Sequence, residues 1–348
     1  MNKLTKVGCS ALCGSLAAIS AANAGDLTVT GGADMTWISL SDQVTGNPLG
    51  VGSNFVLKGD GELDNGWTVA LAINHDNKGV YSTTTIDLGL GSLGSINFNQ
   101  GNSGNGIDSF DDKMPTAWEE AWGAGLSTGV KLVSGVGPSQ NIQYTFPTIA
   151  GSTLKVAYAP SVGSTDVNDK AVGGVTHTAA TGRGVDVTLN VNPSFGTEVL
   201  SGLNLFAGAS EIEQFDQSIA DNKYEGTVGY TYSLGPVSIG GQTSAQYTGE
   251  TDGQQINVYK TTGFGIAFNV NDNLSASYGT IESRKAGRTH SSMYSPNGDL
   301  ISVKSVQAAY TMGGASVRVA HVTADNTNFS ADTGADVQAM IVSLGLAF

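Results

Sequence analysis

The sequence predicts an all-β protein, namely a transmembrane, antiparallel, up-and-down β-barrel of about sixteen strands. Three observations predict this fold class: the composition, a hydrophobic period of two residues, and links that alternate between short and long. Of the 348 residues, 48 are Gly and only 8 are Pro, while the apolar fraction is an ordinary 40%. This composition is typical of a folded β protein rather than of a disordered chain. No uninterrupted apolar window of about 18 residues occurs, so no membrane-spanning helix is predicted.

The first 24 residues are predicted to be a secretory signal peptide. Lys3 and Lys6 supply its positive start, residues 7–22 supply a short apolar core, and Ala22-Asn23-Ala24 is the A-x-A cleavage pattern. The predicted barrel is therefore residues 25–348. Both cysteines of the chain lie in the signal peptide, so no disulfide, cysteine metal site or cysteine nucleophile is expected in the mature protein.

The predicted strands follow the alternation of large apolar and small or polar side chains. In residues 67–73 and 185–191, for example, every second residue is large and apolar. Each strand then has one apolar and one polar face. Because an unpaired backbone group in hydrocarbon costs several kcal/mol, a sheet in a membrane has to close on itself. The strands are predicted at residues 26–40, 51–63, 67–76, 80–90, 93–100, 140–146, 153–160, 183–192, 203–213, 223–234, 237–247, 255–270, 274–285, 300–312, 315–325 and 335–348.

The links between these strands indicate two different rims. Five are tight turns of residues that tolerate turn geometry: Asp64-Asn65-Gly66, Gly91-Ser92, Gly235-Pro236, Asn271-Asp272-Asn273 and Gly313-Gly314. The longer links are residues 41–50, 101–139, 161–182, 214–222, 286–299 and 326–334. With some exceptions short and long links alternate, as in a barrel with turns at one rim and loops at the other. Aromatic residues near strand ends suit an interface belt: Trp37, Trp67, Tyr158, Tyr232, Phe268 and Phe348.

Several function classes are disfavoured. The net charge of −14 comes with no basic stripe, which argues against a nucleic-acid partner. Residues 89–94 satisfy the pattern G-x-G-x-x-G, but a predicted strand rather than a helix follows, so these glycines are interpreted as turn residues. The four histidines lack ligand spacing, and G-x-S-x-G is absent. We therefore expect no enzyme, no cofactor and no metal site. Collection of a divalent ion by the acidic loop is the less favoured alternative, since EF-hand spacing is absent.

The end of the chain and its longest link resemble a known family. Residues 343–348 form an alternating strand that ends in Phe348, similar to the terminal strand of outer-membrane proteins. With the signal peptide and the hairpin series, the chain resembles a Gram-negative general porin, most closely the alphaproteobacterial, Rhodobacter-type porins. The local similarity is in residues 101–122, which contain Phe110, Met114 and Trp118. One departure concerns the arginine cluster common in such porins, because only Arg183, Arg284, Arg288 and Arg318 are available.

The resemblance implies an outer-membrane channel of a Gram-negative bacterium, in contact with outer-membrane lipid, for passive diffusion of small hydrophilic solutes and ions. It also implies a homotrimer and a loop after the fifth strand that folds inward and narrows the lumen. Two other functions stay open: a channel selective for one nutrient class, and a surface adhesion protein. Conductance with and without candidate solutes separates the two channels, and solubility without detergent would favour adhesion.

The narrowest point is predicted to lie at residues 101–139. A barrel of this size leaves a water-filled lumen, and a link this long is usually functional or disordered. Aromatic and methionine side chains could anchor the link to the wall (Phe110, Met114, Trp118 and Trp122). The predicted constriction combines acids of the link with cations whose strand positions face the lumen: Asp108, Asp111, Asp112, Glu119, Glu120, Lys58, Lys155 and Arg318. Such an arrangement sets a transverse field and favours cations if the acids line the path. The alternative is an ordinary solvated surface loop.

Overall fold

A computed structural model describes residues 27–41, 46–77, 80–101, 104–120, 126–163, 181–193, 197–215, 221–250, 256–287, 300–332 and 334–347. The predicted signal peptide lies outside the described residues, as do Trp122, Arg288 and Phe348. What was expected of them therefore remains a prediction.

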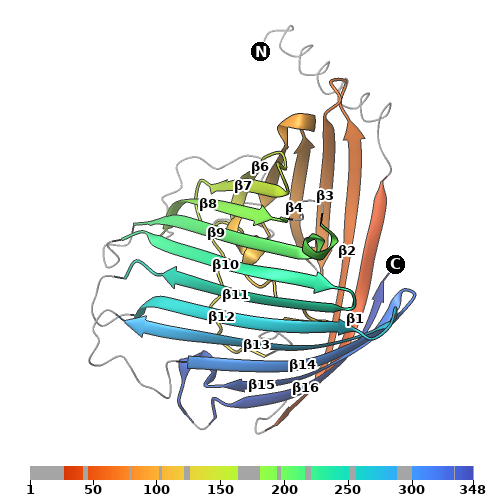
Figure 1. The fold of residues 1–348 in the computed structure, drawn as a ribbon, viewed down its shortest axis with the longest axis vertical. Helices are drawn as coiled ribbons and strands as arrows, with labels where there is room; N and C mark the ends of the chain where they lie inside the picture. The colour runs from red at the N-terminus through yellow and green to blue at the C-terminus, as the bar shows by residue number, and fades with distance from the viewer. Residues whose placement is uncertain are drawn as a thin grey trace.

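The described strands form one closed barrel in which every strand pairs antiparallel with its sequence neighbours, and β1 closes the barrel against β16 (Figure 1). Each predicted boundary lies within two residues of the observed one, and four strands match at both ends. The strands are β1 (Thr28–Ser41), β2 (Leu49–Glu62), β3 (Thr68–Asp76), β4 (Val80–Gly89), β5 (Ser95–Gln100), β6 (Gln140–Thr145), β7 (Ser152–Ala159), β8 (Thr181–Val191), β9 (Leu203–Gln214), β10 (Lys223–Leu234), β11 (Val237–Tyr247), β12 (Ile256–Asn269), β13 (Leu274–Gly287), β14 (Leu300–Met312), β15 (Ala315–Asp325) and β16 (Val337–Ala347).

The two faces of the sheet differ as the alternation predicted. Large apolar side chains such as Val51, Val228 and Val306 are exposed on the outer face, with Val51 71% exposed. Their sequence neighbours on the inner face are small or polar, because successive side chains of a strand point to opposite sides. The outside of the barrel therefore suits hydrocarbon, and the inside suits water except on β13–β16, where apolar residues such as Ile281, Val303 and Ile341 also face inward.

The links form the two predicted rims, with two exceptions. At the turn rim, the link 192–202 is long and contains the single helical turn α2 (Glu198–Ser201). At the loop rim, the link 77–79 is short. The register between β3 and β4 shifts at a β-bulge beyond Asn74, and Asn77 has a left-handed φ of 55° that suits a tight turn. The five predicted tight turns are present, with a 3₁₀ turn η1 (Gly91–Leu93) between β4 and β5, and the short link 146–151 between β6 and β7 is a further turn at the turn rim that the sequence analysis does not name. Among the described helical segments, none has the length and apolar character needed to cross a bilayer.

The described parts of the link between β5 and β6 (residues 101–139), which are residues 104–120 and 126–139, run inside the barrel (Figure 1). We call it the inner loop, with an outgoing limb (104–120) that starts with the 3₁₀ turn η2 (Gly106–Phe110) and a return limb (126–139). The main buried apolar cluster lies between this loop and the lumen side of β13–β16, and its members include Met114, Ile281, Ile301, Val303, Val322 and Ile341. Trp118, Leu126 and Val130 of the loop pack against the same cluster. The inner loop therefore fills part of the lumen along β13–β16, and the anchoring expected of Phe110, Met114 and Trp118 is confirmed.

Candidate pore constriction

Side-chain amides on the wall hold the outgoing limb by its backbone. Gln242 of β11 accepts a hydrogen bond from the Lys113 N–H at 3.0 Å and donates one to the Asp111 carbonyl at 2.8 Å. Gln307 of β14 accepts from the Glu119 N–H at 2.9 Å and donates to the Glu119 carbonyl at 2.7 Å. Each amide thus satisfies both a donor and an acceptor of the loop, as a neighbouring strand would. The limb consequently lies on the inner wall as a second layer.

A buried carboxylate joins the two limbs. Asp186 of β8 is fully buried, and its Oδ2 accepts the N–H of Ile107 from the outgoing limb at 2.9 Å and that of Val136 from the return limb at 3.0 Å. The loop approaches closely here, because a Cβ added at Gly106 or Gly135 would lie 2.1 Å from the same oxygen. Both glycines also have left-handed φ values, of 60° and 50°. Asp186 therefore holds the start of the outgoing limb and the end of the return limb against the same point of the wall.

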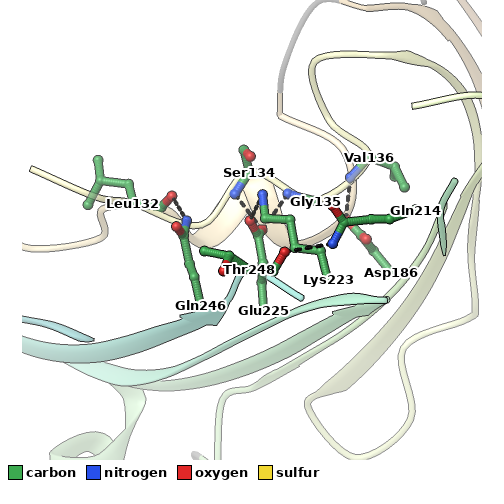
Figure 2. A network of polar contacts seen from close by, with 10 residues as sticks. All are labelled: Leu132, Ser134, Gly135, Val136, Asp186, Gln214, Lys223, Glu225, Gln246 and Thr248. Carbon is green, nitrogen blue, oxygen red and sulfur yellow. Dashed lines mark hydrogen bonds and ion pairs between the residues drawn. The ribbon is translucent and has the colours of Figure 1, made fainter. Parts of the chain in front are cut away.

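A second carboxylate holds the return limb, as Figure 2 shows. Glu225 of β10 accepts the N–H groups of Ser134 and Gly135 through Oε2, at 2.8 and 2.7 Å. Its other oxygen lies 2.5 Å from the Nζ of Lys223, and the Glu225 side chain is fully buried. Gln246 of β11 donates to the Leu132 carbonyl beside it. Charge-assisted bonds to backbone amides are among the stronger hydrogen bonds, so this limb is firmly fixed.

Glycines of β12 make room for the outgoing limb. A Cβ at Gly265 would lie 2.8 Å from the carbonyl oxygen of Pro115, and a Cβ at Gly263 would lie 2.2 Å from the sulfur of Met114. The sulfur is the flexible end of a side chain and can move, whereas the Pro115 carbonyl is backbone. Of these two positions of β12, Gly265 is therefore the one that requires glycine.

We expect Gly265→Val to push the outgoing limb into the lumen and to reduce single-channel conductance in planar bilayers, because the limb cannot retreat through the wall. Gly59→Val on β2 is the matched control, since a Cβ at Gly59 meets no atom within 4 Å. Equal conductance of the two variants would contradict the close packing described here.

The predicted acids of the loop are placed unequally. The pKa of Asp111 is raised to about 6, mainly by burial; the nearby charges of Asp108 and Glu120 contribute to this rise, whereas the hydrogen bond from the Asp112 N–H and the charge of Lys113 oppose it. Asp108, Asp111 and Glu120 thus share one electrostatic neighbourhood. Asp112 instead accepts the Met114 N–H at 3.1 Å in a turn of the loop.

Glu119 lies at the far end of the outgoing limb. Burial raises its pKa, and Glu120 and Asp34 add to the rise, while Arg318 opposes it. Arg318 of β15 forms an ion pair with Asp34 of β1, and its guanidinium carbon lies 5.4 Å from the centre of the Trp118 ring. A guanidinium therefore bridges the loop end and the wall.

The other two predicted cations are not gathered with Arg318. Lys155 faces the lumen from β7, where its register partners are Thr145 and Thr188. Lys58 faces the lumen from β2, on the part of the wall that the inner loop leaves bare. It lines a hollow of about 790 Å³ together with Asp60, Glu62 and Asp87. The structure thus disperses the three cations around the lumen.

Residues that the sequence analysis overlooked also line this lumen: Asp34, Asp60, Glu62, Asp87 and Lys113. The sequence could have indicated two of them, because Asp60 and Glu62 lie two and four positions after Lys58 in the same strand and therefore point to the same face of the sheet. Of the described arginines only Arg318 faces inward. Arg183 is on the outer face with Glu213, 2.7 Å away, and Arg284 alternates with the lumen-facing Ser283. In the described ranges no three His, Cys, Asp or Glu side chains are grouped as metal ligands.

Comparison with known proteins places this geometry in context. The profile of a family described as Gram-negative porin matches residues 8–300. A porin refined at 1.8 Å shares 11% sequence identity over 93% of this chain and 100% of that chain, with a TM-score of 0.64. An anion-selective porin from Comamonas acidovorans shares 13% over 93% and 99%, with a TM-score of 0.62. The Salmonella typhi OmpF, solved with daunomycin, shares 14% over 92% and 97%, with a TM-score of 0.65. No curated protein sequence matches significantly.

Proposed function

Because the chain belongs to the Gram-negative porin family, and is thus an outer-membrane channel for passive diffusion of small hydrophilic solutes and ions, we propose that its inner loop forms the constriction of the channel and gives the channel a preference for cations. The observation that carries this proposal is the attachment of the loop to the inner wall through Gln242, Gln307, Asp186 and Glu225. A loop held in this way keeps its charges at one place in the lumen. The Rhodobacter-type subfamily remains a prediction.

The charges of the constriction act on permeating ions through the water that fills the lumen. The loop carries the cluster of Asp108, Asp111 and Glu120. The hollow that Lys58 lines is itself acidic at Asp60, Glu62 and Asp87. An ion in a narrow passage is close to both, within the Debye length of about 10 Å at 0.1 M salt. Cations are stabilised there and anions are repelled. The remaining predicted members, Asp112, Glu119, Lys58, Lys155 and Arg318, are proposed to shape the transverse component of the field.

The charge of Asp111 gives the proposal a pH dependence. An acid with a pKa of about 6 is ionised above pH 6 and neutral below it. The ratio of cation to anion permeability should therefore fall as the pH drops from 7.5 to 5. Asp111→Asn should lower the ratio about fivefold at pH 7.5, because one unit charge about 4 Å away in water is worth about 1 kcal/mol.

The test is the reversal potential in a potassium chloride gradient. In Asp111→Asn the ratio should be low at pH 7.5 and should change little down to pH 5. Glu213→Gln is the control, because Glu213 pairs with Arg183 on the outer face. A wild-type channel without cation preference at pH 7.5 would contradict the proposed selectivity.

We also propose a homotrimer and cleavage after Ala24. The family supports the trimer. Native mass spectrometry in detergent tests both, since it reports subunit number and the mass of the mature chain. No catalytic role is proposed for any residue, in keeping with a family of passive channels.

A further inference from the structure

A second loop also folds inward, at residues 326–332 and 334–336 between β15 and β16. Its 3₁₀ turn η3 (Thr327–Phe329) contacts the return limb of the inner loop. The Asn328 N–H donates to the Thr128 carbonyl at 2.9 Å. The return limb is shaped for this contact, because Gly129 has a φ of +77° and a Cβ there would lie 2.9 Å from the Cα of Asn328. Two loops that are 200 residues apart in sequence are thus joined backbone to backbone.

The turn is held in an unfavourable conformation. Asn326, Asn328 and Phe329 have φ values of 55°, 55° and 57°. Asn tolerates the left-handed region, but an aromatic residue rarely adopts it, and such strain persists only where the surroundings impose it. Here the Asn326 N–H donates to Asp336 at 2.9 Å, and the Thr327 N–H donates to the Ala335 carbonyl at 3.0 Å.

The conformation places the ring of Phe329 over the lumen wall. The ring centre lies 5.7 Å from that of Tyr259 on β12 and 5.3 Å from the Nζ of Lys285 on β13. Lys131 of the return limb lies over the Tyr259 ring, and its Nζ is 5.5 Å from the centre of that ring. Phe329 also packs on the buried apolar cluster beneath the inner loop. The strained residue therefore links the second loop, the wall and the return limb.

We propose that Asn328 and Phe329 are positioning residues of the channel, which clamp the return limb and thereby keep the constriction at one width. This inference rests on the proposed role of the inner loop as the constriction. Neither residue has to touch a permeating solute. Their action is through Thr128 and Tyr259, which connect them to a limb that ends at the carboxylates Glu225 and Asp186.

The test uses the full-length protein with Phe329→Ala, and measures both hydrogen exchange and single-channel current. Deuterium uptake at the Lys131 amide, which donates to Ser283 at 3.2 Å, should rise, and open-channel current should fluctuate more. Phe329→Tyr should leave both the deuterium uptake and the current fluctuation at their wild-type values, because it keeps the aromatic ring. Phe268→Ala is the control, since Phe268 is an exposed aromatic on the outer face of β12.

A second variant covers the case in which Phe329→Ala fails to fold. Gly129→Ala disturbs the contact from the side of the return limb and should have the same two effects. Unchanged exchange and unchanged current fluctuation in the folded variants would overturn the clamp. If exchange rises but neither these variants nor removal of residues 106–120 alters the current, the clamp holds the limb and the constriction proposal is the part that fails.

Discussion

Deleting residues 106–120 should raise the single-channel conductance about twofold or more, because a sixteen-stranded barrel without its inner loop is an open aqueous cylinder. The deleted segment contains η2 and most of the outgoing limb, and it lies against the inner wall from β8 to β14. Its removal takes away material that occupies the lumen. It also removes Asp111 and Glu119, so the preference for cations should fall in the same variant.

The measurement is conductance of the purified variant in planar bilayers, after a heat-shift assay on gels has shown that the barrel is folded. The strands themselves should tolerate the deletion, since each is paired with two neighbours independently of the loop. Gly59→Val again serves as a control for a change that lies outside the lumen. An unchanged conductance in a folded barrel would remove the constriction role from this loop and leave the fold as described.

The strands were predictable because the membrane imposes a simple rule on them. Hydrocarbon requires a closed sheet with apolar side chains on every second position, and turn residues interrupt this pattern at short intervals. β10, β11, β14 and β15 accordingly match their predicted boundaries at both ends. The link 77–79 is a case in which the expectation of long loops at one rim fails, because a bulge and a left-handed Asn replace the loop.

The path of the inner loop could not be predicted in the same way. The alternation of side chains along each strand shows that Gln242, Gln307 and Asp186 face the lumen, but many other polar side chains also face it. Which of them meets the loop depends on the closure of the barrel, since Gln307 and Glu119 are 188 positions apart. The inward position of Phe329 could not be predicted either. It depends on a left-handed backbone conformation, which no sequence pattern predicts for an aromatic residue. Asp60 and Glu62, by contrast, could have been assigned to the lumen by the parity that placed Lys58 there.

Replacing Asp186 should loosen the whole inner loop, and this is the second large effect that we expect. In Asp186→Ala the buried amides of Ile107 and Val136 lose their acceptor, at a cost of about 1–3 kcal/mol for each orphaned group. The loss should appear as a lower free energy of unfolding in denaturant and as a noisier open channel. Thr188→Ala is the matched control, because Thr188 is the next buried lumen-facing residue of β8 and its hydroxyl makes no hydrogen bond to the described part of the loop.

The conservative variant distinguishes the charge of Asp186 from its shape. Asp186→Asn keeps one carbonyl oxygen that can accept from both amides, so its loss of stability should be smaller than that of Asp186→Ala. Glu225→Gln should differ, because it also leaves Lys223 without its ion-pair partner at 2.5 Å. It acts on the return limb alone, through Ser134 and Gly135, whereas Asp186 binds both limbs. If Asp186→Ala proved no more disruptive than Thr188→Ala, the loop would be held chiefly by its apolar contacts with the β13–β16 wall, and the amide network would be secondary.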